Sequence, residues 1–311
     1  AQPASLAVDV LAGGGVSDLN GVFEPGERVV VSPSWQNPSG GPADLTATIS
    51  AFGPLLAPGA TDTIADGTAS YGSVPAGATA GCAGATGDCY ELEVPVPAER
   101  PATHWDATVT ETLSTGAEKT WTLHLGDSFT DVPTSDWAYR YIETIFHNGV
   151  TLGCGVRVYC PLSLLTRAEM AILVLRAKHG PGWAPPVATG TVFTDVPIDY
   201  WAAPFIEQFK AEGITLGCGP TTYCPESTMT RTEMAVFLIR AKHGSGWIPP
   251  ASTGTVFTDV PIDHWAGDYI EALAAEGITL GCGPQVYCPD GFVTRAEMAA
   301  FLTRTFGLEL H

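Results

Sequence analysis

The sequence predicts an α+β multidomain protein, in which an N-terminal antiparallel β-sandwich precedes a helical module of three helix-loop-helix repeats. Three observations lead to this fold class. Short runs of alternating apolar and polar residues fill residues 1–125, a motif then recurs three times at a constant interval, and the eight cysteines fall into four close pairs. With 35 glycines and 25 prolines in 311 residues, the chain must also contain extensive loops and turns.

Residues 1–125 contain about seven candidate strands separated by turns rich in Pro, Gly and Ser. Their number and alternation fit an antiparallel sandwich of immunoglobulin-like size. We expect Val29, Val31 and Trp35 to face its core, because alternate residues of a strand point to the same side. The predicted strands are SLAVDVL (5–11), ERVVVSPSW (27–35), LTATISAF (45–52), TASYGSV (68–74), YELEVPV (90–96), HWDATVTETL (104–113) and EKTWTLHL (118–125).

One acidic stretch of this part suggests a metal site. DLNGVFEPGE, residues 18–27, places oxygen-bearing side chains at short intervals around a glycine, and calcium accepts such ligands. The candidate ligands are Asp18, Asn20, Glu24 and Glu27. The alternative, which we prefer, is an Asn-Gly turn followed by a Pro-Gly turn with solvated acids. No other cofactor is expected.

An internal repeat governs the rest of the chain. Phe129-Thr130-Asp131-Val132-Pro133 recurs at Phe193 and at Phe257, a shift of 64 residues each time. Trp137, the first cysteine of each pair and an arginine recur at the same interval, without insertion or deletion. Three such copies indicate three stacked units, which we place at 127–190, 191–254 and 255–311.

Each repeat is predicted to contain two helices that bury their apolar faces in a shared core. The first begins near the tryptophan and ends at Gly149, Gly213 or Gly277, since glycine readily adopts the left-handed cap. The second begins at a Thr-x-x-Glu capping box. The three predicted boxes are Thr166/Glu169, Thr230/Glu233 and Thr294/Glu297.

The cysteines are predicted to form disulfides within their close pairs, in an oxidising compartment. Zinc is the rival interpretation, but each repeat offers one wide pair and no nearby histidine, whereas structural zinc usually needs two closer pairs. The pair in each repeat would pin the loop between the two helices. The predicted bonds are Cys82–Cys89, Cys154–Cys160, Cys218–Cys224 and Cys282–Cys288.

The repeated pattern F-x-D-V-P, W-A, G-I-T, aromatic-x-P and T-R-A-E resembles the S-layer homology domain over about residues 127–311. The resemblance implies three motifs that close into an all-α, pseudo-threefold module whose grooves bind cell-wall polysaccharide, often pyruvylated. The cysteine pair, with its Tyr-Cys-Pro, departs from the family pattern. Residues 1–125 resemble, at the level of fold only, the Ig-like modules that precede anchoring domains in secreted bacterial proteins.

The arginine of each T-R-x-E turn needs a separate explanation, because a cation at the first helical position opposes the helix dipole. One alternative is a salt bridge to Asp131, Asp195 or Asp259 of a neighbouring motif. The other, which the resemblance favours and which we expect, is a site in which the arginine and exposed helix-start amides hold an anion of the glycan. Under this second hypothesis, arginine-to-alanine changes abolish binding without loss of thermal stability.

We expect the motif tryptophans to pack helix against helix in the core, with a sugar platform formed by a partly exposed indole as the alternative. The resemblance makes nine residues candidates for glycan binding: Arg167, Arg231, Arg295, Asp131, Asp195, Asp259, Trp137, Trp201 and Trp265.

The totals exclude several classes of function. A net charge of −19 argues against nucleic acid and against anionic membranes. No apolar run approaches the roughly 20 residues of a transmembrane helix. We find no G-x-S-x-G, no H-E-x-x-H and no phosphate-binding glycine loop, and the seven histidines are scattered, so no enzyme is expected.

These observations favour a non-catalytic, extracellular cell-surface protein whose three motifs bind envelope polysaccharide and anchor the chain. One alternative is a homo-oligomeric or polymeric subunit of a surface layer, sheath or filament, in which the first strand, ahead of Gly13–Gly15, pairs with a neighbouring molecule. Pairing within the chain is the simpler expectation for that strand. A further alternative is the C-terminal anchoring tail of a secreted hydrolase.

Overall fold

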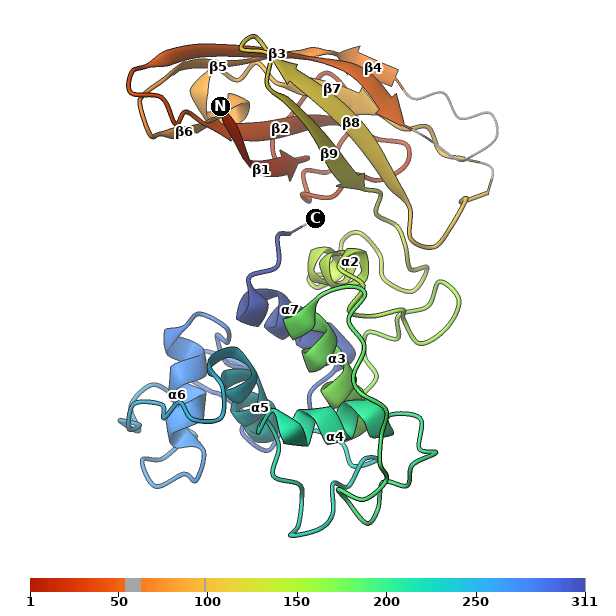
Figure 1. The fold of residues 1–311 in the computed structure, drawn as a ribbon, viewed down its shortest axis with the longest axis vertical. Coiled ribbons are helices and arrows are strands. Elements are labelled where there is room, and N and C mark those ends of the chain that lie inside the picture. Colours follow the sequence, from red (N-terminus) through yellow and green to blue (C-terminus); the bar gives the residue numbers. More distant parts are fainter. Residues whose placement is uncertain (54–62, 98, 311) are drawn as a thin grey trace. The chain divides into compact units, whose positions relative to one another are not determined.

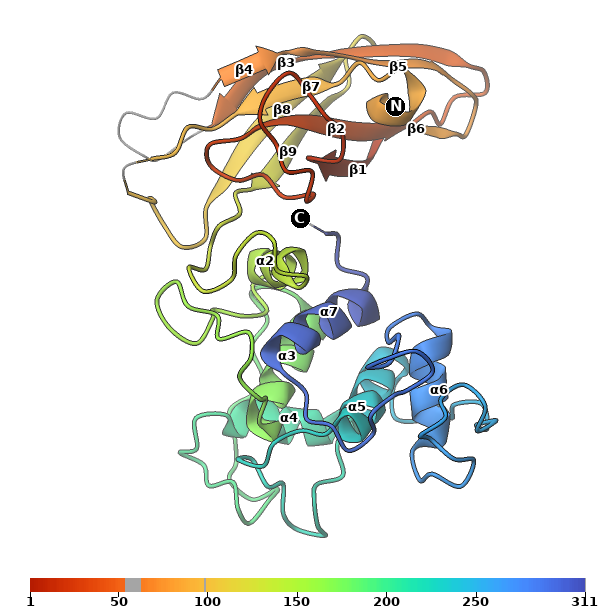
Figure 2. The same ribbon diagram turned by 180° about the vertical axis from the view of Figure 1, so that it is seen from behind.

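The computed structural model describes residues 1–53, 63–97 and 99–310, which divide into two compact units (Figures 1 and 2). The β-sheet unit contains Ala1–Glu143, Val156–Val158 and Leu310 within these described residues. The repeat unit contains Thr144–Gly155 and Tyr159–Glu309. The two compact units divide near residue 143, later in the chain than the predicted domain boundary near residue 125. The predicted domain boundaries stay a prediction.

Two antiparallel sheets form the β-sheet unit. The first sheet has the order β1-β2-β7-β4, with β6 also paired to β2, and the second has the order β5-β3-β8-β9. Their strands are β1 Gln2–Val8, β2 Arg28–Gln36, β3 Ala43–Gly53, β4 Thr63–Asp66, β5 Thr68–Val74, β6 Thr79–Gly81, β7 Tyr90–Glu93, β8 Asp106–Leu113 and β9 Glu118–His124. The first strand pairs with β2 of the same chain, as expected.

Buried side chains from both sheets form one apolar core. The burial of β8 alternates strictly from residue to residue, which is the pattern of a strand with one face in a core. Val29, Val31 and Trp35 of β2 are buried, so the prediction of an inward face there is confirmed. The short helix α1, Cys82–Ala85, lies in the loop between β6 and β7.

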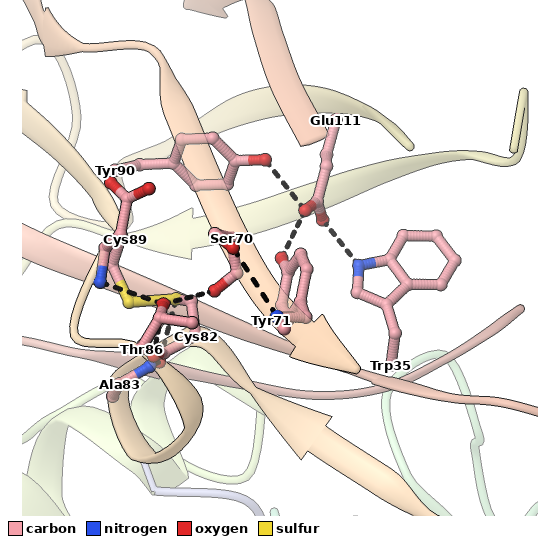
Figure 3. The surroundings of a disulfide bond; sticks show 12 residues. Trp35, Ser70, Tyr71, Cys82, Ala83, Thr86, Cys89, Tyr90 and Glu111 are labelled. Atoms are coloured by element: carbon pink, nitrogen blue, oxygen red, sulfur yellow. Dashed lines mark hydrogen bonds between the residues drawn. A yellow bond between two sulfur atoms is a disulfide. The ribbon is translucent and has the colours of Figure 1, made fainter. Parts of the chain in front are cut away.

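A carboxylate lies inside this core. Glu111 of β8 is fully buried, and Figure 3 shows its oxygens facing Trp35, Tyr71 and Tyr90. Oε2 accepts from the indole N–H groups of Trp35 at 3.0 Å and Trp121 at 2.7 Å. Oε1 accepts from the hydroxyls of Tyr90 at 2.8 Å and of Tyr71. The four donors come from strands of both sheets, so this carboxylate links the two layers.

All four predicted disulfides are confirmed. The first lies beside the core of the β-sheet unit, where Cys82 begins α1 and Cys89 directly precedes β7 (Figure 3). The other three lie in the loops between the two helices of each repeat, as the clamp hypothesis requires.

Six longer helices follow the β-strands (Figure 1). Each second helix begins at a complete capping box, in which the threonine hydroxyl accepts from the glutamate N–H, so all three predicted boxes are confirmed. Gly149, Gly213 and Gly277 have φ of 68–70° just after the first helices, as predicted for their ends. The helices are α2 Tyr139–His147, α3 Arg167–His179, α4 Ala203–Ala211, α5 Arg231–His243, α6 Gly267–Ala275 and α7 Arg295–Phe306.

The second helices α3, α5 and α7 all contact one another, and each of α4 and α6 packs on the second helix of the preceding repeat, α4 on α3 and α6 on α5. Lys178 of α3 reaches Glu212, the residue after α4, at 2.7 Å. Burial works to raise the pKa of the Glu212 carboxyl, but hydrogen bonds from Lys178, Gln208 and His179 lower it overall. Contacts between repeats therefore stabilise the helices.

The predicted fold class is wrong in its second half: cyclic contacts join the starts of the second helices, but the described residues of the repeats do not form an all-α, pseudo-threefold module of three equivalent helix pairs. Helix α2 is divided between the two compact units instead of matching α4 and α6. Isolated β-bridges also join the segments that lead into the second helices: Leu164 to Thr294, Thr166 to Thr228, and Thr230 to Phe292.

The physical reason lies in the helix caps. The N-cap threonines have extended backbones, with φ between −82° and −85° and ψ between 158° and 161°. An extended segment leaves its N–H and C=O groups to pair outside itself, and neighbouring caps supply the partners. No helix among the described residues combines the length and the apolar character of a membrane-spanning helix.

Candidate functional site

The three motif arginines are buried at the starts of α3, α5 and α7, with exposed fractions of 3%, 3% and 6%. Each guanidinium Nε donates at 2.8 Å to the carbonyl of a tyrosine in another repeat, and that tyrosine hydroxyl donates to the carbonyl of the same arginine. The pairs are Arg167 with Tyr223, Arg231 with Tyr287, and Arg295 with Tyr159.

Each arginine also forms an ion pair with a capping-box glutamate of another repeat. The Nη1–Oε1 distances are 2.7 Å for Arg167–Glu233, 2.8 Å for Arg231–Glu297 and 3.4 Å for Arg295–Glu169. The glutamate serves two helices, since Oε2 of Glu169 also accepts from the backbone N–H of Thr166 at 2.9 Å. The arginine of the first repeat pairs with the glutamate of the second, the arginine of the second with the glutamate of the third, and the arginine of the third with the glutamate of the first. The three ion pairs therefore close a ring.

A backbone ring lies beneath these side chains. The backbone N–H of Leu165 donates to the carbonyl of Val293, the N–H of Val293 to the carbonyl of Met229, and the N–H of Met229 to the carbonyl of Leu165. The N–O distances are 2.9–3.0 Å. The first amide of each second helix also donates to a carbonyl of another repeat, as Arg167 does to Ser227 at 3.0 Å. The helix-start amides that an external anion would need are therefore engaged inside the protein.

The arginines thus hold an internal negative partner, as the salt-bridge alternative required, but the partner is glutamate and not aspartate. These contacts offset the unfavourable helix dipole, because each buried guanidinium has one carboxylate and one backbone carbonyl as acceptors. Nη2 of Arg167 and Nη2 of Arg231 are buried without a hydrogen-bond partner among the described residues. Glycan contact by these arginines stays a prediction.

The motif aspartates organise the cysteine loops. Asp195 accepts from the backbone N–H groups of Tyr223 at 2.8 Å and Cys224 at 2.7 Å. Asp259 makes the same two contacts, at the same distances, with the loop that contains Cys288. These contacts and the disulfide hold Tyr223 and Tyr287 in place, and the backbone carbonyls of these tyrosines accept hydrogen bonds from Arg167 and Arg231. Asp131 lies in the β-sheet unit, and its predicted role is untested.

The motif tryptophans do not pack in the core. Trp137, Trp201 and Trp265 are 61%, 59% and 71% exposed, although aromatic side chains usually bury most of their surface. The core-packing interpretation is therefore wrong, and the platform interpretation has the exposed rings that it needs.

Trp201 borders a pocket of about 310 Å³ within the repeat unit. Leu152, Ile172 and Leu173 supply apolar walls, and Phe205 lies beneath the guanidinium of Arg176, 5.6 Å from the ring centroid. Glu169 and Arg295, the ion pair with the longest separation in the ring, also line it. The pocket therefore joins an exposed indole to one charged pair, a combination suited to a polar ligand with an apolar face.

Sequence reasoning missed part of this site. It assigned Glu169 to capping alone and did not consider Leu152, which is 71% exposed. The available signal was the recurrence of Leu152 as Leu216 and Leu280, which are exposed as well. An exposed leucine at one position of every repeat has no explanation from packing.

The candidate calcium loop satisfies part of its polar groups internally, although Oε2 of Glu24 is buried without a hydrogen-bond partner among the described residues, and Asp18 and Glu27 lie close to Asp9. The side chain of Asp18 accepts from the Asn20 N–H at 3.0 Å, and Glu27 accepts from the N–H groups of Asp18 and Glu24 at 3.1 and 3.2 Å. Burial, followed by the contact with Glu27, raises the pKa of Glu24 to about 9 in the metal-free protein. These contacts fit the turn interpretation better, and calcium binding stays a prediction.

Three stretches of the chain, residues 128–171, 192–235 and 256–299, match the S-layer homology domain family. S-layer protein EA1 from Bacillus anthracis is 27% identical over 180 residues, covering 58% of this chain and 20% of the relative. A cellulosome-anchoring protein from Acetivibrio thermocellus is 26% identical, covering 48% and 33%. An amylopullulanase from Thermoanaerobacterium thermosulfurigenes is 30% identical, covering 56% and 9%.

The similarity to these relatives is confined to part of each chain. The chain spans about a fifth of the length of the first S-layer relatives, at 20% and 22%. The family matches begin at residue 128, so they do not test the Ig-like interpretation of the β-sheets. A DNA glycosylase structure from Pseudomonas fluorescens, covering 40% of this chain and 30% of its own at 13% identity, has a TM-score of 0.21, too low to indicate a shared fold.

Proposed function

We propose that this chain, which carries three S-layer homology domains, is a non-catalytic cell-surface protein that anchors itself by binding envelope polysaccharide. The relatives support an extracellular location, since they include S-layer proteins and a cellulosome-anchoring protein. The described residues show no long apolar helix that could anchor the chain in a bilayer instead.

The exposed tryptophan beside the pocket carries the glycan-binding part of this proposal. Sugar rings have an apolar face of C–H groups, which packs on an indole, and hydroxyls that bond to charged groups at the rim. Trp201, with the Glu169–Arg295 pair on the same pocket, provides both. The acidic protein repels an anionic polymer at long range, so the affinity must come from such short-range contacts.

The structure supports different roles for the other motif residues. The arginines and the cysteine loops form contacts between the three repeats. The tryptophans are exposed and are not part of these contacts. A tryptophan can therefore be changed with little effect on the fold.

We expect Trp201→Ala to weaken binding to isolated cell walls by about 5–30-fold, which corresponds to about 1–2 kcal/mol for an aromatic anchor. Co-sedimentation of the full chain with cell walls measures this. Ile248→Ala is the matched control, because Ile248 is 84% exposed and does not line this pocket. Walls from which the polysaccharide has been extracted should not pellet the protein.

Equal pelleting of wild type and Trp201→Ala would contradict a role for this pocket, and equal pelleting with extracted walls would contradict polysaccharide as the ligand. Regular polymers formed by the purified chain without glycan would favour the surface-layer or filament alternative. An amylopullulanase and an exoglucanase among the relatives favour the alternative of an anchoring tail of a secreted hydrolase, and sequencing the gene upstream of residue 1 tests it.

A further inference from the structure

We propose that the end of the β8–β9 hairpin holds a zinc ion through His104, Asp106 and His124. One nitrogen or oxygen atom from each of these residues lies within 4.8 Å of the others. Asp106 is the first residue of β8 and pairs directly with His124, the last residue of β9. His104 precedes Asp106 by two positions, so the hairpin end brings the three side chains together.

The distances fit zinc coordination. Nε2 of His104 lies 3.3 Å from Oδ1 of Asp106, and Nδ1 of His124 lies 3.1 Å from the same oxygen. In a tetrahedral site with bonds of about 2.0–2.1 Å, neighbouring ligand atoms are about 3.3 Å apart. Two edges of a zinc tetrahedron, both ending at Oδ1 of Asp106, therefore already have about the required length, and the third pair of atoms lies within 4.8 Å.

A second carboxylate positions the buried histidine. The His124 side chain is fully buried, and its Nε2 lies 2.8 Å from Oε2 of Glu143, which is 1% exposed. Oε1 of Glu143 is fixed by the backbone N–H of Ser128 at 2.9 Å. When Nδ1 binds a metal, Nε2 carries the proton and donates to Glu143, which is the usual partner arrangement of a metal-binding histidine.

The ligand set and the compartment favour zinc over calcium, magnesium and iron. Two imidazoles and a carboxylate suit zinc, iron, copper or nickel, whereas calcium and magnesium prefer oxygen alone. Four disulfides place the chain in an oxidising environment, where reduced iron is not maintained. Zinc has no redox chemistry and is unaffected there. The ion would lock the hairpin end and Glu143 into one geometry.

Titration of the untagged, chelator-stripped full chain with Zn²⁺ alone tests this site by calorimetry. We expect one bound ion per chain at this site, and at least about 10-fold weaker binding for His104→Ala and for Asp106→Asn. Glu143→Gln keeps the size of the side chain and should weaken binding about 10–100-fold by disturbing the orientation of His124. Zinc should also raise the melting temperature of the wild type.

Two control variants distinguish this site from others. His243→Ala removes a histidine of the repeat unit, and Asp18→Asn changes a separate acidic cluster with Asp9 and Glu27; both should bind zinc as the wild type does. The His104 side chain is 44% exposed, so His104→Ala should melt at the temperature of the metal-free wild type. Absence of zinc binding by the wild type, or unchanged affinity in both ligand variants, would overturn the proposal.

Discussion

Replacing Glu111 with leucine is expected to lower the free energy of unfolding of the β-sheet unit by at least about 3 kcal/mol. Leucine approximates the volume of the side chain but leaves four buried donors, from Trp35, Tyr71, Tyr90 and Trp121, without their acceptor. Each unsatisfied buried donor costs about 1–3 kcal/mol. Burial and then the charge of Glu111 raise the pKa of both tyrosines, so they keep the protons that they donate.

Urea unfolding followed by tryptophan fluorescence measures the effect, since two of the donors are indoles. Glu118→Leu is the matched control, because Glu118 is exposed on the neighbouring strand and should change the stability by less than about 0.5 kcal/mol. Glu111→Gln retains one acceptor oxygen and should fall between the two. A Glu111→Leu protein as stable as the control would show that the carboxylate does not hold the sheets together.

Changing Arg231 to alanine is expected to destabilise the repeat unit by about 3 kcal/mol, the lower end of the effect of breaking a buried ion pair, because the Glu297 side chain that is left behind is 29% exposed. The variant leaves Glu297 without its 2.8 Å partner and the carbonyl of Tyr287 without its donor. It also removes a guanidinium that stacks 5.1 Å from the centroid of the Tyr287 ring. This reverses the expectation, drawn from the sequence, that such a change would spare stability.

Thermal unfolding of the repeat unit provides the measurement. Arg240→Ala, on the same helix but only partly buried, is the control and should cost less than about 1 kcal/mol. Arg231→Lys keeps the charge but not the planar fork of donors, so most of the loss should remain. Unchanged melting of Arg231→Ala would instead return the arginine to the role of an external ligand.

Local features of the repeats were predictable from the sequence, because their causes are local. Thr230 and Glu233 are three residues apart, and a capping box requires nothing else. Gly213 is predictable for a similar reason, since a positive φ after a helix favours glycine wherever the helix packs. The disulfide pairs followed from short separations along the chain.

The role of the arginines was not predictable in the same way. At the level of one helix, Arg167 opposes the dipole, which suggested an external anion. Its actual partners, Glu233 and the carbonyl of Tyr223, lie 66 and 56 positions away. The β-bridges could not be expected from side-chain patterns either. They are formed by backbone carbonyls and amides, which nearly every residue has.

The histidines illustrate the same limit. His104 and His124 are twenty positions apart and were judged scattered, yet the antiparallel register of β8 and β9 places both beside Asp106. Two predicted strands joined by a short turn would have allowed this inference, had the register been known. A slip of one residue would have turned His124 to the opposite face of the sheet.

The most direct test of the account is a calorimetric titration of purified envelope polysaccharide into the chain and into a triple variant, Trp137→Ala, Trp201→Ala and Trp265→Ala. All three indoles are more than half exposed, so the variant should melt as the wild type does while its affinity falls at least about 30-fold. A folded triple variant that binds the polysaccharide as tightly as the wild type would contradict the claim that the exposed tryptophans hold the glycan.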